Sequence, residues 1–374
     1  MGGDVPGSVV RAWASAMLVA AVLAGCGTGT RPAAEGAPWD SLPPGWSSLA
    51  PPPVARSSGV SVWTGRELFR WGGNTDYDRT IHADGALFDP AAGTWRRVPA
   101  WPLAARSLAG ATWTGKEVFV WGGWSLGAAG AGSTGWGDGA LFDPATGKWR
   151  VLPPAPLSTR MPVAVVWTGT EVLVWGSDDR PAASEHREGA AYDPKLGTWR
   201  LLPHAPIGLN EAHGLWTGQE LVVFGALLDG NNWSDTRYAQ GIAYDPEANS
   251  WRRLPEYPLS PQASTVAWTG KEVIAWDYDM KGGAYDPARD SWRKLPDVPL
   301  GFSECYPESA RLGEVVLAWF CGQGAEFQAS TSRWRRIAPA PAEIFGRPVS
   351  AGEVVVFAGA AEDGSRNRLW AYKP

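Results

Sequence analysis

The chain has 374 residues, among them 24 Trp, 46 Gly and 32 Pro, and it carries a formal net charge of -5. The many aromatic side chains, with 44% hydrophobic and only 19% charged residues, exclude intrinsic disorder. Lys and Arg are scattered singly, so no basic stripe can neutralise phosphates and nucleic acid is not an expected partner. Evenly spread Gly and Pro favour many short strands joined by turns over a helical bundle.

The N-terminus has the features of an export signal. An apolar run at 12–24 is too short to cross a bilayer as a helix. It ends in Leu23-Ala24-Gly25-Cys26, which resembles the lipobox of bacterial lipoproteins, where the Cys is diacylated before cleavage. We therefore expect a signal peptide at 1–25, lipidation of Cys26, a flexible tether at 26–38 and a bacterial extracytoplasmic protein anchored to the cell membrane. A plain signal peptide with a chance Cys is the alternative.

A repeat organises the rest of the chain. Trp-Thr-Gly, followed one residue later by Glu, occurs five times between two short apolar runs, and this arrangement is typical of a hairpin. Two degenerate copies, Leu312-Gly313-Glu314 and Ala351-Gly352-Glu353, raise the number of repeats to seven. The five complete copies begin at Trp63, Trp113, Trp167, Trp216 and Trp268.

A second hairpin follows in each repeat. An aromatic residue, usually followed by Asp-Pro, stands seven residues before a Trp, and the residues between them are typical of a turn. Each repeat therefore predicts four strands, and the spacing of successive repeats fits a propeller blade. The six pairs are Phe88 with Trp95, Phe142 with Trp149, Tyr192 with Trp199, Tyr244 with Trp251, Tyr285 with Trp292 and Phe327 with Trp334.

The seventh repeat lacks its last strand at the C-terminus. Tyr372 is the aromatic residue of its second hairpin, and the chain ends at Pro374 before the expected Trp. The missing strand is expected at the N-terminus around Trp46, where the spacing of the following residues is approximately that after Trp149. We predict an all-β fold at 39–374, a seven-bladed propeller whose last blade is closed by the N-terminal strand.

These motifs resemble the kelch repeat. The shared pattern is an apolar strand ending in Trp-Gly-Gly, as at Trp71-Gly72-Gly73, then an aromatic residue with Asp-Pro, then Gly-x-Trp and Leu-Pro-x-x-Pro. It covers residues 39–374 and is clearest in the first four repeats. The resemblance implies a kelch-type β-propeller of the kind found in galactose oxidases and related bacterial proteins. It does not fix a function, because this architecture carries oxidases, sugar isomerases and binding modules.

Two cysteines remain after Cys26. Cys305 and Cys321 lie symmetrically about Gly313, at the centre of the sixth hairpin turn, so they should be opposite each other or one residue out of register. In an oxidising compartment this placement predicts a disulfide bond. Two free buried thiols are the alternative.

Four arginines stand where a Pro-rich link enters the innermost strand of a blade. A ring of guanidinium groups at this place would bind a carboxylate or phosphate. Alternatively, these arginines belong to the repeat and tie neighbouring blades together. The four residues are Arg56, Arg106, Arg160 and Arg347.

Long insertions connect the second and third predicted strands of the first four repeats, so all four should reach the same face of the ring. They carry Trp124, Trp136 and Trp233, whose rings would either stack on sugar faces or only pack the loops onto the scaffold. The first functional hypothesis is therefore a membrane-anchored binding module for a glycan or an envelope protein, monomeric and without a cofactor.

An enzyme is the alternative, because the fold implied by the resemblance is shared by sialic-acid mutarotases and galactose oxidases. The fourth repeat has Glu211 and His213 where others have Arg, and with Arg106 and Arg160 these groups would serve anomeric exchange by acid–base chemistry. A copper oxidase of this type needs a Cys cross-linked to Tyr, and the two mature cysteines are expected to pair with each other. Oxidase activity is therefore disfavoured.

No pattern in the sequence predicts a metal site. The four histidines show no paired metal-ligand spacing. Three acidic pairs lack the complete calcium-loop pattern with a terminal Glu, so they are interpreted as solvated loop carboxylates. They are Asp76 with Asp78, Asp178 with Asp179 and Asp277 with Asp279.

We predict that non-reducing mass spectrometry of the mature protein detects a peptide pair joined through Cys305 and Cys321. Such a bond would close a loop in the unfolded chain and so lower its conformational entropy. It would thereby stabilise the sixth repeat, one of the two with the weakest motifs. Rapid alkylation of both thiols without denaturant or reductant would contradict the disulfide.

Overall fold

The computed structural model describes residues 39–75, 80–126, 133–176, 187–228, 236–256, 263–277, 279–300, 308–320, 322–341, 344, 347–359 and 367–374. These residues form strands, turns and connections, and none of them lies in a helix; a membrane-spanning helix is likewise not found among them. One compact unit spans Pro38–Pro374. The predicted signal peptide, Cys26, Cys305 and Cys321 lie outside the described residues, so the anchor and the disulfide stay predictions.

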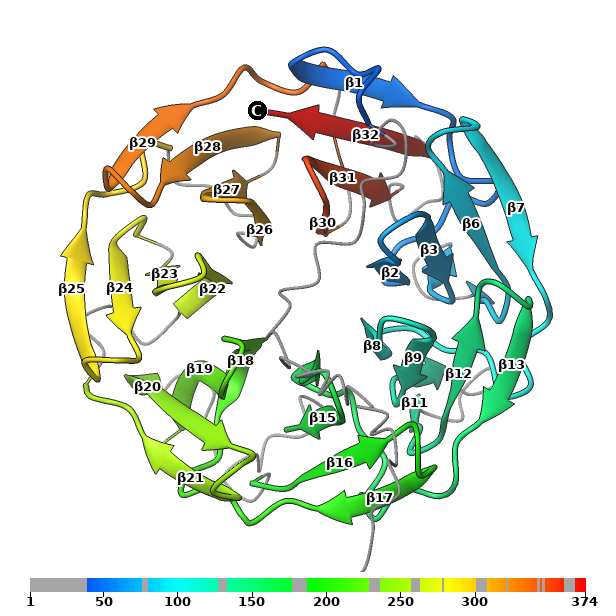
Figure 1. Cartoon of the computed structure of the whole chain (residues 1–374), viewed down its shortest axis with the longest axis horizontal. Coiled ribbons are helices and arrows are strands. Elements are labelled where there is room, and N and C mark those ends of the chain that lie inside the picture. The colour runs from blue at the N-terminus through cyan, green and yellow to red at the C-terminus, as the bar shows by residue number, and fades with distance from the viewer. Residues whose placement is uncertain are drawn as a thin grey trace, which may run out of the picture. The chain divides into compact units, whose positions relative to one another are not determined.

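Seven four-stranded antiparallel sheets form a ring, with the first strand of each blade nearest the centre (Figure 1). The innermost strands of neighbouring blades contact each other all the way round, including those of the last and first blades. The predicted seven-bladed β-propeller is therefore confirmed.

Each of the first six blades is formed by the four main strands of one sequence repeat. Blade 1 has β2 (Val60–Trp63), β3 (Leu68–Trp71), β6 (Gly85–Asp89) and β7 (Thr94–Val98), and blade 2 has β8 (Gly110–Trp113), β9 (Val118–Trp121), β12 (Gly139–Asp143) and β13 (Lys148–Val151). Blade 3 has β14 (Ala164–Trp167), β15 (Val172–Trp175), β16 (Gly189–Asp193) and β17 (Thr198–Leu201), and blade 4 has β18 (Asn210–Trp216), β19 (Leu221–Leu228), β20 (Thr236–Asp245) and β21 (Ser250–Arg253). Blade 5 has β22 (Ala263–Trp268), β23 (Val273–Asp277), β24 (Gly282–Asp286) and β25 (Ser291–Leu295), and blade 6 has β26 (Glu308–Leu312), β27 (Val315–Phe320), β28 (Gln323–Gln328) and β29 (Arg333–Arg336).

Blade 7 joins the two ends of the propeller. It consists of β30 (Pro348–Ala351), β31 (Val354–Gly359), β32 (Arg368–Lys373) and the N-terminal strand β1 (Gly45–Leu49). The register pairs Trp46 with Tyr372, and their ring centroids are 5.0 Å apart. The closure predicted from the spacing around Trp46 is confirmed.

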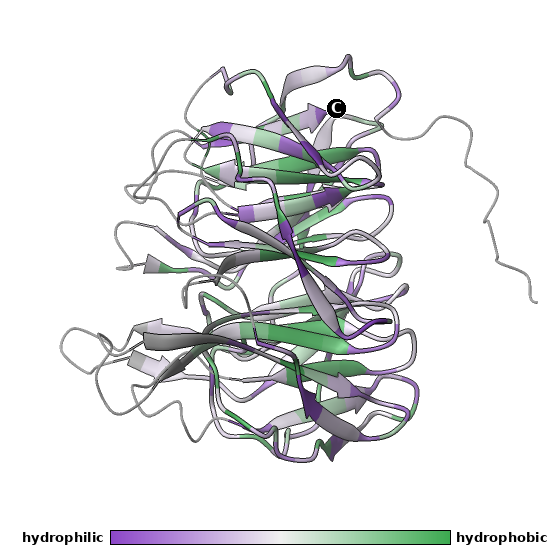
Figure 2. Cartoon of the chain, turned by 90° about the vertical axis from the view of Figure 1, so that its left-hand side faces the viewer, coloured by the Kyte–Doolittle hydropathy of each residue, from purple (hydrophilic) through white to green (hydrophobic). Residues whose placement is uncertain are grey.

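The ring has two different faces. The face that we call the turn face carries the Trp-Thr-Gly and Asp-Pro hairpin turns, and the opposite face, the long-loop face, carries the links between blades and the connections from second to third strands. On the long-loop face, the first two insertions form short hairpins, β4 (Asn74–Thr75) with β5 (Thr80–Ile81) and β10 (Trp124–Leu126) with β11 (Ser133–Gly135). Figure 2 shows apolar residues along the strands and polar residues at the turns.

The Trp-Thr-Gly turn is closed by its own threonine. The Thr64 hydroxyl accepts a hydrogen bond from the Glu67 backbone N–H and donates one to the Glu67 carbonyl, both at 3.0 Å. Gly65 lies in the left-handed region with φ 85°, where a Cβ would be strained. The same threonine geometry recurs in the four other complete copies. Side-chain and backbone chemistry together therefore fix the hairpin that the motif predicts.

The core consists of seven clusters, one between each pair of neighbouring blades. Phe119 and Trp121 of blade 2, for example, pack with Val172 and Tyr192 of blade 3. Another cluster, at the closure between blades 7 and 1, contains Trp39. Each blade thus buries both of its faces only when a neighbour stands on either side.

Every outermost strand is hydrogen-bonded to the preceding blade through a tryptophan. In all seven blades the indole Nε1 donates to a carbonyl of the link that leaves the blade before it, at 2.8 to 3.2 Å. Trp46 makes this bond with Ala338 and so ties β1 to blade 6. The seven donors are Trp46, Trp95, Trp149, Trp199, Trp251, Trp292 and Trp334.

The arginine that follows this tryptophan contacts the next blade and not the preceding one. Arg200 binds Glu171 of its own Trp-Thr-Gly turn at 2.6 Å and also donates to the Tyr244 hydroxyl of the next blade at 3.2 Å. Blades 1, 2, 4 and 5 repeat the Arg–Glu pair, and blades 2 and 4 also repeat the contact with the next tyrosine. The Trp-Thr-Gly-x-Glu motif identifies this Glu, whereas its Arg partner is marked in the sequence only by the Trp-Arg that follows every complete turn motif.

We predict that Trp46→Ala lowers the free energy of unfolding by about 3 kcal/mol, because it removes a packed ring and the indole hydrogen bond that hold β1 in place. Urea denaturation followed by tryptophan fluorescence would measure the change. Ser48→Ala is the matched control: Ser48 is exposed on the same strand, so its substitution should change the free energy by less than about 0.5 kcal/mol. Equal effects of the two substitutions would show that β1 does not hold the ring closed.

Candidate functional site

The long-loop face is built on a repeated contact between one blade and the next. The Gly73 N–H donates to the Arg106 carbonyl, and the Gly123 N–H donates to the Arg160 carbonyl, both at 3.0 Å. Gly72, at φ 68°, faces the same carbonyl, and a Cβ on it would lie only 2.8 Å from that oxygen. The Trp-Gly-Gly motif is therefore needed because the next blade's entry segment lies against it.

Three of the four entry arginines are buried and form hydrogen bonds and ion pairs within their own blades. The Arg56 guanidinium donates to the carbonyls of Gly72 and Asp84 at 3.0 and 2.8 Å, and it pairs with the Asp84 carboxylate at 2.9 Å. Burial lowers the pKa of Arg56, and the charge of Asp84 opposes this change. The guanidinium thus ties the second strand to the third strand of one blade, whereas the backbone of the equivalent Arg106 binds the preceding blade.

Arg106 is completely enclosed, with 0% of its side chain exposed. It pairs with Asp138 at 2.7 Å and donates to the Gly122 carbonyl at 3.2 Å. Its guanidinium carbon also lies over two rings, 5.3 Å from the centroid of Trp101 and 5.2 Å from that of Trp136. These cation–π contacts and the ion pair hold the second insertion against the blade entry.

Arg160 repeats this arrangement in blade 3. Its side chain is 0% exposed, pairs with Glu188 at 3.1 Å and donates to the Ser158 hydroxyl at 2.7 Å. Its backbone N–H donates to the Trp136 carbonyl at 3.1 Å. The carboxylates that bind these arginines all lie just before a third strand, and no sequence motif marks them as partners.

Arg347 differs from the other three because its side chain is 80% exposed. Its Nε lies 3.3 Å from Oε1 of Glu308, the first residue of β26. His213, on β18 of blade 4, is near enough for the Arg347 charge to act on it. The structure thus pairs one carboxylate of blade 6 with an exposed guanidinium at the entry of blade 7, and the charge of that guanidinium reaches a histidine of blade 4.

The charges in this group shift two pKa values. Burial, together with the positive charge of Arg347, lowers the pKa of His213 to about 4. Burial raises the pKa of Glu308, and Arg347 opposes that change. His213 is therefore a neutral imidazole at neutral pH, able to donate one hydrogen bond and accept another.

The candidate aromatic residues lie on the second insertion. Trp124 begins β10, and its backbone exchanges two hydrogen bonds with Ser107 at 2.8 and 3.0 Å. Trp136 donates from Nε1 to the Ser125 hydroxyl at 3.2 Å and covers Arg106. Both side chains are partly exposed. Trp233 lies outside the described residues, as does the Glu211 side chain.

No group of three or more His, Cys, Asp or Glu side chains that could hold a metal ion occurs within the described ranges. Of the three acidic pairs, Asp277 with Asp279 lies within these described ranges, and the other two pairs lie outside them.

Sequence comparison gives no direct indication of function: no protein-family model matches the chain, and no curated protein matches it. Function must therefore be argued from the two faces of the propeller and from the places where one blade departs from the others.

We predict that His213 makes the folded protein less stable as the pH falls from about 6.5 to about 4. The unfolded chain binds the proton near 6.5 and the folded chain only near 4, so between these values the unfolded state holds more protons and stability rises with pH. The expected contribution over this range is up to about 3 kcal/mol. Urea denaturation of the native chain and of His213→Gln at several pH values measures it as the loss of slope in the variant.

His204→Gln provides the control, because His204 is exposed on the link that follows β17. It should keep the pH dependence of the native chain. An unchanged slope in His213→Gln would show that this imidazole is not held neutral.

Proposed function

We propose that the chain is a kelch-type binding module, anchored through Cys26 on the extracytoplasmic side of a bacterial membrane, that recognises a glycan or an envelope protein with its long-loop face. The kelch assignment is supported by the structural role of each motif residue: Gly72 and Gly73 admit the next blade, and Trp149 binds the preceding link. The anchor is supported by the lipobox-like end of the N-terminal apolar run.

The difference between the two faces carries the proposal. On the turn face, side chains that repeat from blade to blade are engaged with each other, as Arg200 is with Glu171 and Tyr244. On the long-loop face, the connections differ in length and structure, from the β10–β11 hairpin to the extended β19 and β20. Varied connections on a rigid ring are the usual location of recognition sites.

A glycan is the ligand class that the described residues favour. Trp124 and Trp136 are partly exposed, and the contacts of Trp136 with Arg106 and Ser125 fix its ring in place. A ring held in one orientation loses little entropy on stacking against the apolar face of a sugar. The Asp138 carboxylate, 41% exposed and bound to the same Arg106, supplies an acceptor for hydroxyl groups.

A sugar mutarotase remains the second candidate because of the His213 group. A neutral imidazole that feels the charge of an exposed guanidinium, itself paired with a carboxylate, has the groups that proton transfer at an anomeric centre requires. Arg106 and Arg160 contribute less to this alternative than the sequence suggested, since both guanidinium groups are enclosed and paired with carboxylates.

We predict that the soluble chain from Trp39 onward binds a subset of a glycan array and that Trp124→Ala weakens this binding by about 10-fold or more, as loss of a central aromatic contact does. Leu196→Ala is the matched control. Leu196 is an apolar residue, 72% exposed, on the turn face, and its substitution should leave the affinity unchanged.

Parallel NMR measurement of anomeric exchange, on any sugar that is bound, separates the two candidate functions. If the native chain catalyses exchange and Glu211→Gln abolishes it, the protein is a mutarotase and the binding-module proposal is wrong. Binding without exchange supports the module. If no glycan is bound, the glycan part of the proposal fails, and a protein partner has to be sought by cross-linking on intact cells.

A further inference from the structure

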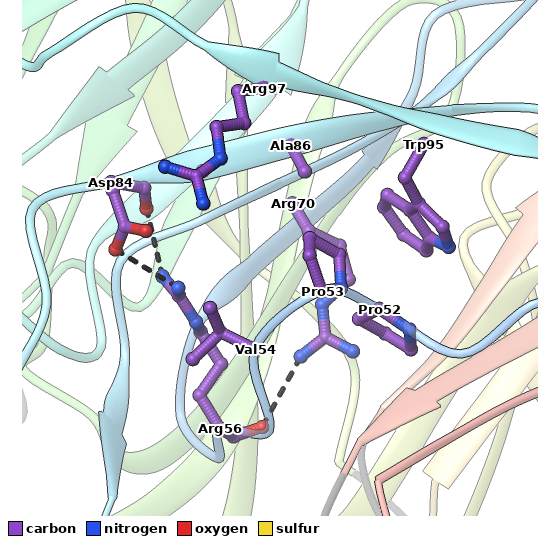
Figure 3. Close-up of a pocket in the computed structure, with 10 residues that line it drawn as sticks. Pro52, Pro53, Val54, Arg56, Arg70, Asp84, Ala86, Trp95 and Arg97 are labelled. Carbon is purple, nitrogen blue, oxygen red and sulfur yellow. Dashed lines mark hydrogen bonds and ion pairs between the residues drawn. The ribbon is translucent and has the colours of Figure 1, made fainter.

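A small pocket lies where blade 1 meets the segment that links β1 to β2. Its walls are Pro52, Pro53 and Val54 of the link and the side chains of three strands of blade 1 (Figure 3). Its volume is about 30 Å³, room for roughly two water molecules or one small polar group. The pocket is separate from the His213 group and from the aromatic residues of the second insertion.

The pocket is formed by an Arg-Ala-Arg row across the sheet. The register places Arg70 of β3 beside Ala86 of β6, and Ala86 beside Arg97 of β7. Side chains in such a row point to the same side of the sheet. Because Ala86 is small, the two long side chains border a hollow above it, and Arg56 and Asp84 line the same hollow.

Arg70 is an exception to the repeat. At the position equivalent in register, every other blade has a buried apolar residue, so the sheet itself does not require a charge there. The six equivalents are Val120, Val174, Val223, Ala275, Ala318 and Phe357.

The buried guanidinium of Arg70 is only partly satisfied. Arg70 is 5% exposed, and its Nη2 donates to the Arg56 carbonyl at 3.3 Å, a long hydrogen bond. Its Nη1 is buried without a hydrogen-bond partner among the described residues. Burial lowers the pKa of Arg70 to about 10, and the nearby positive charge of Arg56 acts in the same direction. A buried charge left unpaired is costly, and an anion would remove that cost.

The charges around the pocket do not balance. Asp84 is its acidic residue, and Arg56 holds that carboxylate. Arg97 is exposed and has no ion pair or hydrogen bond within the described ranges. Two guanidinium groups, one buried and one exposed, are therefore available to the same ligand.

We propose that this pocket is a binding site for one small oxyanion, such as a carboxylate group, held between the guanidinium groups of Arg70 and Arg97. The Arg70 Nη1 donates to the anion from below and Arg97 covers it from the solvent side. Charge-assisted hydrogen bonds from two guanidinium groups suit the planar carboxylate, and the volume admits a single such group. The site lies beside the closure of the ring, so an occupant contacts both blade 1 and the link from blade 7.

Isothermal titration of the full chain with sodium acetate and, in a second arm, sodium phosphate, at constant ionic strength, tests the site. Binding is expected in at least one arm, and the arm that binds more tightly identifies the anion class. Arg70→Val, which installs the residue found in blades 2, 3 and 4, should raise Kd by at least about 10-fold, the effect of losing one charged hydrogen bond. Its melting temperature without anion should equal or exceed that of the native chain, because a buried unpaired charge has been removed.

Two further variants make the result decisive. Arg97→Gln, at an exposed position where folding is not at risk, should also weaken binding several-fold. Arg253→Gln, at the equivalent position of blade 4 opposite the apolar Val223 and Ile242, should leave Kd unchanged. Binding by neither anion, or equal affinity in native and Arg70→Val chains, would overturn the proposal. A lower melting temperature of Arg70→Val without anion would also do so, because it would assign Arg70 to the fold.

Discussion

The packing of blade against blade is the constraint on which this protein depends. A single four-stranded sheet has two apolar faces, and the seven core clusters show that each face is buried only against a neighbour. The tryptophan of every outermost strand adds a directed hydrogen bond to the preceding link. This bond has the same donor in all blades, so the ring is held by one contact used seven times, including at the closure.

This repeated requirement limits where function can lie. The turn face and the blade entries are occupied by residues that the ring itself needs, among them the threonine of each complete Trp-Thr-Gly turn and the arginine after the tryptophan in blades 1 to 5. Variation is possible only in the connections of the long-loop face and at positions where one blade departs from its neighbours. The departures are informative, because the six other blades serve as an internal reference for what the fold requires.

The arginines illustrate the distinction. Arg106 and Arg160 are buried and each is paired with a carboxylate of its own blade, so their charge is used within the scaffold even though Arg106 Nη2 has no hydrogen-bond partner among the described residues. Arg70 is equally buried but has a single long hydrogen bond to a carbonyl, and its equivalents elsewhere are apolar. The environment of the guanidinium, and not the residue type, separates the structural arginines from the one assigned to a ligand.

The sequence by itself determined the number of blades, their four-strand content and the closure by β1, because hairpin turns and strand periodicity are local and recur at regular spacing. The tertiary structure alone decided what the polar side chains do. The carboxylate partners of Arg106 and Arg160 stand 28 or more residues away along the chain, and His213 comes under the charge of Arg347, which enters a different blade. The strand pattern does not distinguish Arg70 from other strand residues. Only the register places it in one row with Ala86 and Arg97. Such contacts depend on which distant segments meet and on how completely water is removed, and neither is written in a local pattern.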